Sequence, residues 1–150
     1  MIRVLFVVLA LAIANPAAAQ ISSPVKWSYK ATKRTDTSYA IVLTASMQAP
    51  WYIYSQNTGK GGPIPTSITF KANPQVMTSG QVMETGKLQK TFDKSFNMTV
   101  LYYRGTVQFT QIVNVKNGAK PVLTGSVEYM ASSGSQTLQP AKTTFSLALR

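Results

Sequence analysis

The fold of this chain is indicated most clearly by one stretch, Tyr39-Ala40-Ile41-Val42-Leu43-Thr44-Ala45-Ser46-Met47. Every odd-numbered position in it is apolar, and the polar residues Thr44 and Ser46 lie between apolar ones. Side chains along a β-strand alternate between the two faces of a sheet. The period of two therefore predicts a strand whose odd-numbered face is buried in a core.

Similar segments, rich in β-branched and aromatic residues, recur along the chain, whereas helical periodicity is nearly absent. Asp36 marks the turn between the first two segments. Arg104-Gly105 and Lys116-Asn117-Gly118 supply turns on either side of a strand at 106–115, and the Asn-Gly pair is typical of a hairpin. The predicted strands are Val25–Ala31, Tyr39–Met47, Trp51–Tyr54, Ser67–Phe70, Val76–Met83, Met98–Tyr103, Thr106–Val115, Leu123–Ala131 and Thr143–Leu149.

Many short strands in a chain of 150 residues predict an all-β fold. Each sheet must bury one face against another, which favours an immunoglobulin-like two-sheet sandwich, with a closed barrel as the alternative. Three segments are predicted loops. They are Asn57–Pro65, which is rich in glycine and proline, the polar stretch Thr85–Asn97, and Ser132–Gln139.

The first residues have the layout of a secretory signal peptide. Arg3 precedes the apolar run Val4–Ala14, which is shorter than the ~20 residues needed to cross a bilayer as a helix. Ala17 and Ala19 place small residues where a signal peptidase reads them. We therefore expect cleavage after Ala19 and a single periplasmic domain at 20–150 with no transmembrane segment, a retained membrane anchor being the alternative.

The sequence contains no cysteine and no histidine. This composition removes the usual general base near neutral pH, the commonest zinc ligands and the only strong thiol nucleophile. We therefore expect no metal, no cofactor and no enzymatic activity. Without Arg3, 14 of the 15 basic residues remain against 4 acidic ones, a net charge of +10. The basic residues are dispersed, which indicates weak attraction to anionic surfaces and no nucleic-acid site.

Several phrases of the sequence stand in a distinctive order. They are Val25-Lys26-Trp27-Ser28, Trp51-Tyr52-Ile53-Tyr54-Ser55-Gln56, Gly62-Pro63-Ile64-Pro65-Thr66-Ser67, Lys90-Thr91-Phe92-Asp93 and Val127-Glu128-Tyr129-Met130. In this order and spacing they resemble the N-terminal periplasmic domain of DsbD-type thiol:disulfide interchange proteins, also called the disulfide bond corrector domain family. The resemblance implies an immunoglobulin-like sandwich. It also implies a domain that takes electrons from a membrane-embedded neighbour and passes them to periplasmic partner proteins.

The resemblance further implies where the family's two redox cysteines would lie. In the family they follow the Val-Glu-Tyr-Met phrase, four or five residues apart, and precede a Leu/Tyr-Pro-Pro sequence. Matching Leu138 and Pro140 to that ending places Ser132 and Thr137 at the cysteine positions. Thiol exchange needs a thiolate and a second sulfur, which hydroxyls do not replace, so we expect the redox function to be absent.

The family also shields its cysteines with a cap loop, which corresponds here to Thr91–Asn97. Asp93 matches an acidic cap position. Phe96 is the favoured aromatic lid, Ser95 is its alternative under a one-residue shift, and Phe92 is a further candidate of this loop.

A second candidate site comes from the residues alone. Tyr102, Tyr103 and Arg104 are consecutive and would form an exposed recognition patch. The alternative is that one of the adjacent tyrosines points inward, because neighbouring side chains on a strand face opposite sides.

Together these observations predict a non-catalytic periplasmic module that binds another envelope protein through its loops at 91–97 and 132–139. One alternative is membership or regulation of a thiol–disulfide interchange or cytochrome c maturation pathway. Another is binding of an anionic envelope component through the basic surface. The chain ends at Arg150, directly after the predicted sandwich, so we expect none of the transmembrane and thioredoxin-like modules of full-length DsbD proteins.

Overall fold

A computed structural model describes residues 23–150. The predicted signal peptide at 1–19 lies outside these residues. Within them the chain forms β-strands and no helix, and so no helix that could cross a membrane. In chain order the strands are β1 (Val25–Lys33), β2 (Ser38–Met47), β3 (Tyr52–Tyr54), β4 (Ser67–Phe70), β5 (Val76–Asp93), β6 (Met98–Val115), β7 (Val122–Tyr129), β8 (Ala131–Ser132) and β9 (Ala141–Ala148).

Strand β6 organises the larger of two sheets. Along one edge, its residues 102–104 pair with β3 and its residues 106–114 pair with β2, both antiparallel. Along the other edge, β6 pairs with β5 from one end to the other. Strands β1 and β8 extend the sheet beyond β2 and β3, which makes six strands in all.

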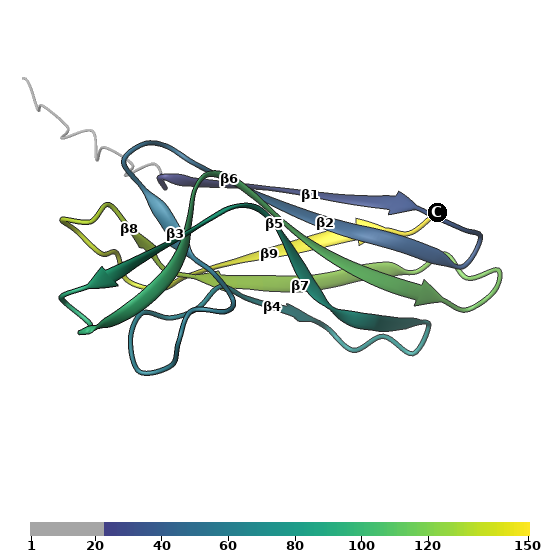
Figure 1. Ribbon diagram of the computed structural model, residues 1–150. Coiled ribbons are helices and arrows are strands. Elements are labelled where there is room, and N and C mark those ends of the chain that lie inside the picture. The colour runs from purple at the N-terminus through teal and green to yellow at the C-terminus, as the bar shows by residue number, and fades with distance from the viewer. Residues whose placement is uncertain (1–22) are drawn as a thin grey trace, which may run out of the picture.

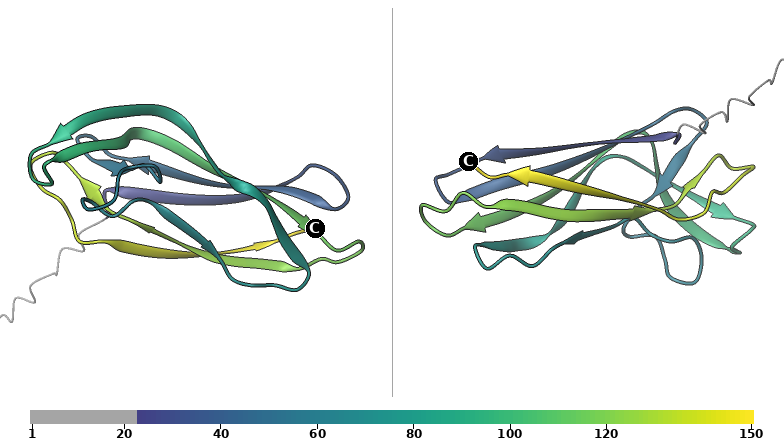
Figure 2. Two further views of the ribbon diagram at one scale, coloured as in Figure 1. Left: turned by 60° about the horizontal axis from the view of Figure 1, so that its bottom comes forward. Right: turned by 180° about the vertical axis from the view of Figure 1, so that it is seen from behind.

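The second sheet has three antiparallel strands in the order β4-β7-β9. Figure 1 shows it layered against the larger sheet, and Figure 2 shows the two layers from two further sides. The predicted all-β, immunoglobulin-like two-sheet sandwich is therefore confirmed. The barrel alternative is wrong, because the two sheets do not join into one closed ladder.

The core between the sheets includes the alternating face that the sequence predicts for β2. The odd-numbered side chains of β2, from Tyr39 to Met47, are all buried, as are Leu123, Val127 and Tyr129 of β7. Aromatic side chains link the layers. The Trp27 ring lies 5.4 Å from that of Tyr129. Each large apolar side chain buried in this way contributes about 1.5–3 kcal/mol to stability.

Gln111 interrupts the apolar face of β6, yet it is buried. Its amide Nε2 donates to the carbonyl oxygens of Ser79 and Ile112, each at 2.9 Å. A buried polar group is tolerated when its hydrogen bonds are made inside the protein. Gln111 therefore ties β5 to β6 where the register of the two strands shifts.

The largest correction to the sequence analysis concerns β5. The stretch Thr85–Asn97 is predicted as a loop, but β5 continues to Asp93 and only the turn before Met98 is irregular. An edge strand is held by pairing with its neighbour, and most side chains of β5 are exposed. Its sequence therefore lacks the alternation of polar and apolar residues that identifies a half-buried strand.

The predicted turn at Arg104-Gly105 is also wrong, because β6 runs through it without a break. Gly105 has a φ of +71°, a conformation that glycine adopts without steric cost. It lies between the residues of β6 that pair with β3 and those that pair with β2. The glycine thus allows one strand to pass from one partner to the next.

The Asn117-Gly118 pair does form a turn, with Gly118 at a φ of +74°. It does not form a hairpin, however, because β6 and β7 belong to different sheets. The turn instead carries the chain from one layer of the sandwich to the other. The turn at Asp36 is as predicted, and Asp36 pairs with Lys33 at 3.2 Å.

Glu84 fastens β5 to the segment that follows β3. Its Oε2 accepts hydrogen bonds from the hydroxyls of Ser55 (2.7 Å) and Tyr103 (2.8 Å), and its Oε1 accepts one from the backbone N–H of Gln56 (2.6 Å). Burial of Tyr103, together with this carboxylate, raises the pKa of its hydroxyl above the ordinary value. One carboxylate thus accepts three hydrogen bonds in the half of the sandwich that contains the turn between β5 and β6.

Replacing Glu84 by alanine is expected to leave three donors without an acceptor. Tyr103→Phe removes only one of the three bonds and should cost about 1–3 kcal/mol, whereas Glu84→Ala should cost more. Urea unfolding followed by tryptophan fluorescence measures both. Glu128→Ala, at an exposed position of β7, is the matched control and should leave the midpoint unchanged. Equal midpoints for Glu84→Ala and Glu128→Ala would contradict the assignment.

Any side chain introduced at Gly125 of β7 is expected to destabilise the fold. It pairs directly with Phe145 of β9, and an added Cβ would lie 2.5 Å from the Phe145 ring and 2.5 Å from the carbonyl oxygen of Thr69. Gly125→Ala should therefore destabilise the fold by about 1–3 kcal/mol, the usual cost of overpacking. Thermal unfolding compared with Ser126→Ala tests this, and an unchanged melting temperature would refute it.

Candidate functional site

A row of four residues crosses one end of the larger sheet. Tyr52 of β3 lies directly opposite Arg104 of β6 on one side and opposite Ser132 of β8 on the other. Ser132 in turn lies opposite Thr137 across an isolated bridge. Residues directly opposite each other in antiparallel strands project from the same face. The backbone register therefore brings Arg104, Tyr52, Ser132 and Thr137 onto one face.

The two predicted cysteine positions contact each other. The Thr137 hydroxyl donates to Ser132 Oγ at 3.1 Å. Ser132 is 2% exposed, and its hydroxyl donates to the carbonyl oxygen of Gln136 at 3.2 Å, while Thr137 is exposed. A buried residue and an exposed one thus form a pair at the base of the loop 132–139.

Aromatic rings and a guanidinium group cover the middle of this face. The Tyr52 and Tyr102 rings lie 4.6 Å apart. The Arg104 guanidinium carbon lies 4.7 Å from the Tyr52 ring centre and 5.4 Å from that of Tyr102, and Arg104 also donates to the carbonyl oxygen of Pro50. Cation–π contacts of this kind orient the guanidinium and leave N–H donors free for an anion.

Tyr54 lies beneath this aromatic layer. It is opposite Tyr102 in the β3–β6 pairing, it is fully buried, and its ring meets that of Tyr52 edge to face at 5.6 Å. Burial, reinforced by the neighbouring Tyr52, raises the pKa of the Tyr54 hydroxyl well above the ordinary value. Tyr54 is therefore a neutral structural support of the site.

The turn between β5 and β6 is held by Asp93. Its Oδ1 accepts hydrogen bonds from the backbone N–H groups of Ser95 (2.8 Å) and Phe96 (3.3 Å). Asn97 follows with a φ of 52°, a left-handed conformation that asparagine adopts more readily than most residues. The acidic residue predicted for the cap loop thus stabilises the turn itself.

These elements meet around a pocket of about 370 Å³. Figure 1 shows the tip of the β5–β6 hairpin and the loop after β8 at the same end of the sandwich, away from the C-terminus. The loop at 91–97, Gly134 of the loop 132–139, Tyr52 and Tyr102 therefore contribute to one concave surface, which we call the cap pocket. Ser132 and Thr137 lie nearby but are not among its lining residues. Its lining residues are Tyr52, Thr91, Phe92, Asp93, Lys94, Ser95, Tyr102, Arg104 and Gly134.

The predicted cap residues lie in two different places. Phe92, Asp93 and Ser95 line the cap pocket, whereas Phe96 is not among its lining residues. Phe96 lies toward the glycine-rich loop instead, where its Cβ would be 3.4 Å from a Cβ added to Gly62. The favoured aromatic lid thus packs against a neighbouring loop, and Ser95 takes the position beside the pocket.

The patch predicted from Tyr102, Tyr103 and Arg104 needs one correction. Tyr102 and Arg104 border the cap pocket, but Tyr103 is 3% exposed and belongs to the core. The reason is the alternation of side chains along β6, which sends Tyr103 to the opposite face from its neighbours. Tyr52 of β3 also lines the cap pocket. Its role in the cap pocket follows only from its pairing with both Arg104 and Ser132.

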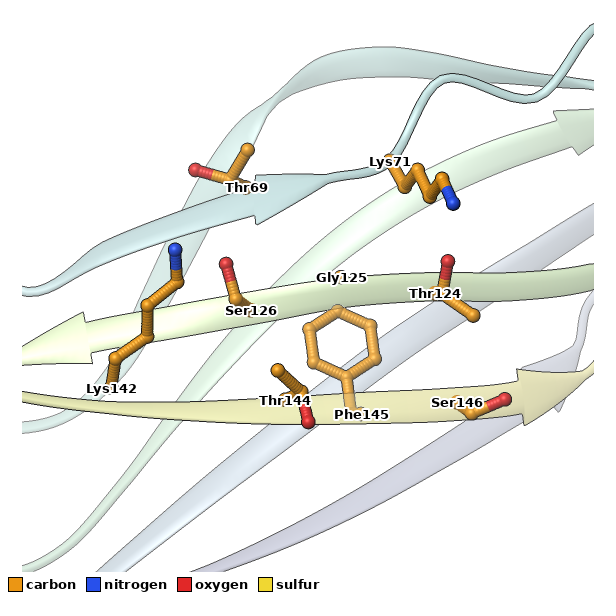
Figure 3. Close-up of a pocket in the computed structure, with 9 residues that line it drawn as sticks. All are labelled: Thr69, Lys71, Thr124, Gly125, Ser126, Lys142, Thr144, Phe145 and Ser146. Atoms are coloured by element: carbon orange, nitrogen blue, oxygen red, sulfur yellow. The ribbon is translucent and has the colours of Figure 1, made fainter.

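A larger hollow of about 670 Å³ lies on the three-stranded sheet. Figure 3 shows Lys71 and Lys142 there among hydroxyl side chains of three strands, with the Phe145 ring beside Gly125. None of the predicted site residues lines it. Within residues 23–150, no group of three or more histidine, cysteine, aspartate or glutamate side chains is arranged to hold a metal ion.

No family model and no curated protein matches this sequence. Solved structures do match. The N-terminal periplasmic domain of ScsB from Proteus mirabilis is 17% identical over 85% of this chain and 46% of its own, with a TM-score of 0.56. The chain therefore spans less than half of that ScsB structure.

The N-terminal domain of DsbD from Neisseria meningitidis, solved in its reduced form, is 12% identical over 76% of this chain and 78% of its own, with a TM-score of 0.51. The resemblance predicted from short sequence phrases is thus confirmed at the level of structure. The described residues have the fold of the N-terminal periplasmic domains of ScsB and DsbD, in a chain that contains no cysteine.

Proposed function

We propose that this domain is a non-catalytic protein-binding module of the periplasm, which docks another envelope protein at the cap pocket. The observation that carries the proposal is one pocket lined by the loop at 91–97, by Gly134 of the loop 132–139, and by Tyr52, Tyr102 and Arg104. Aromatic residues and arginine are the side chains that contribute most to protein–protein binding energy. The fold likeness to two periplasmic domains supports the compartment.

The chemistry of the paired hydroxyls supports a non-catalytic role. A thiol–disulfide exchange would require sulfur at both ends of the Ser132–Thr137 pair. The pair instead forms a hydrogen bond, and Ser132 Oγ also accepts one from the backbone N–H of Gly134 at 3.2 Å. In this proposal the two residues occupy the cysteine positions of redox-active relatives and maintain the shape of the loop 132–139.

Cysteines introduced at these two positions are expected to form a disulfide. Directly opposed residues of antiparallel strands have Cβ atoms roughly 4.5–5.5 Å apart, and a small backbone adjustment reaches the spacing of a disulfide. Ser132→Cys/Thr137→Cys should therefore lose both free thiols under mild oxidation, as measured by thiol titration and mass spectrometry. Ser133→Cys/Thr137→Cys is the control, and faster oxidation of that pair would refute the assignment.

Arg104 is expected to be the main anchor of the partner. Arg104→Ala removes the guanidinium from the two tyrosine rings and should reduce the amount of captured partner at least about tenfold, as for a central hot-spot residue. The measurement is quantitative capture from periplasmic and membrane extract by immobilised protein of residues 20–150. Arg34→Ala, in the β1–β2 turn, is the control. Equal capture of every protein by both variants would reject the cap pocket as the docking site.

Export is a further part of the proposal. The mature protein is expected to begin at Gln20, because Ala19 is the last residue of the predicted signal peptide. Intact-mass analysis of the protein recovered from periplasm checks this. A recovered mass that includes residues 1–19 would contradict cleavage and favour the retained membrane anchor.

The likeness to ScsB and DsbD domains favours a second candidate function. The domain would take part in a thiol–disulfide or cytochrome c maturation pathway as a regulator that competes with cysteine-bearing relatives for their partner. An excess of this domain should then slow the reduction of a DsbD-type N-terminal domain by its electron donor. An unchanged rate, beside retained capture of an envelope protein, would favour the simple binding module.

A further inference from the structure

Strand β5 is the longest uncovered edge of the sandwich. It spans 18 residues and pairs with β6 on one side, and within residues 23–150 no strand pairs with its other side. An open edge presents unpaired backbone N–H and C=O groups, which form a template for another strand. Proteins commonly use such edges to bind extended peptide segments by strand addition.

The same strand carries most of the exposed large apolar side chains. Met77, Met83, Leu88 and Phe92 are 73%, 58%, 50% and 58% exposed, and Val122 of β7 is the other large apolar residue exposed to this degree in the described residues. Exposed apolar groups gathered on one element of a soluble protein indicate an interaction surface. Their location on β5 therefore agrees with the open edge.

Two irregularities divide β5 and leave one regular stretch. The register with β6 shifts between Ser79 and Met83 and again between Gly86 and Leu88. From Leu88 to Asp93 the pairing runs without interruption opposite residues 98–103 of β6. Bulges are one device that hinders unspecific edge pairing. The segment 88–93 is thus the part of the edge best suited to receive a regular strand.

The side chains of the segment 88–93 define which kind of peptide strand would pair with it. Leu88, Lys90 and Phe92 lie opposite Tyr103, Leu101 and Thr99, so all three project from one face of the sheet. Lys90 therefore sits between two exposed apolar side chains. The complementary strand carries an acidic residue between two apolar ones at alternate positions.

A second copy of this chain is a poor occupant. Each copy carries 14 basic and 4 acidic residues outside the signal peptide, a net charge of +10. Lys87, Lys90 and Lys94 lie in or beside the segment, and the carboxylates of Glu84 and Asp93 are engaged by hydrogen bonds within the protein. Like charges on paired edges oppose association. Charge complementarity therefore favours an acidic segment of a different protein.

We infer that the edge of β5 at Leu88–Asp93 binds an extended acidic segment of an envelope protein by strand addition, with an acidic side chain beside Lys90 and apolar side chains beside Leu88 and Phe92. This surface goes beyond the proposed docking at the cap pocket and requires neither Tyr102 nor Arg104. The two surfaces overlap at one end, because Thr91, Phe92 and Asp93 of the segment also line the cap pocket.

The test uses the probe peptide acetyl-Thr-Val-Thr-Glu-Thr-Val-Thr-amide and a matched peptide with lysine in place of glutamate. Amide chemical shifts and hydrogen exchange of residues 20–150 are followed by NMR at millimolar peptide. The glutamate peptide should shift and protect amides of Leu88–Asp93, and the lysine peptide should not. Lys90→Glu should reverse this preference, and Leu88→Ser/Phe92→Ser should weaken binding at least about tenfold. Met77→Ser, on the same strand, is the control and should change nothing.

Three results would overturn the inference: no protection of β5 at millimolar glutamate peptide, equal binding of both peptides, or loss of binding in Arg104→Ala. The last result would place the peptide in the cap pocket and so leave the proposed docking function intact. Retained peptide binding in Arg104→Ala, beside lost capture of the envelope protein, would show that strand addition does not need Arg104 whereas docking at the cap pocket does. Failure of either proposal is thus distinguishable from failure of the other.

Discussion

The rest of the structure depends on the pairing of β6 with three other strands. Its central and C-terminal residues bind β2 and contribute the buried side chains of the main core. Its N-terminal residues pair with β3, and through β3 with β8, which sets the row of Arg104, Tyr52, Ser132 and Thr137. Its other edge holds β5. A single strand thus connects the stabilising core to both candidate binding surfaces.

At the end of the larger sheet where β5 turns into β6, the two faces of the sheet have different roles. Tyr103 points into the core and binds Glu84, so that face secures β5 to the sandwich. Tyr102 and Arg104, one position away on either side, border the cap pocket. In the proposed docking these side chains are carried by a hydrogen-bonded strand, which limits the conformational entropy lost on binding.

At the pair of Ser132 and Thr137, the fold is present without the sulfur atoms that thiol exchange needs. The fold of the N-terminal periplasmic domain of DsbD is present, and the hydroxyls of Ser132 and Thr137 lie at hydrogen-bond distance from each other. Oxygen at both positions forms a hydrogen bond but supplies neither a thiolate nor a disulfide. In the proposed function the partner binds at the neighbouring cap pocket, where aromatic rings, Arg104 and Lys94 offer apolar contact and positive charge.

The sequence by itself determined the fold class, the buried face of β2 and the absence of cysteine. Alternation of side chains and the identity of the reactive atoms are local properties, so they are readable from the chain alone. Only the tertiary structure decided the course of β5, the passage of β6 through Gly105, and the meeting of Tyr52 with Ser132 and Arg104. An edge strand such as β5 is held by pairing and not by burial, so its sequence carries no clear pattern of buried residues. The register of paired strands joins residues that are far apart in the chain, so it too leaves no local signal in the sequence.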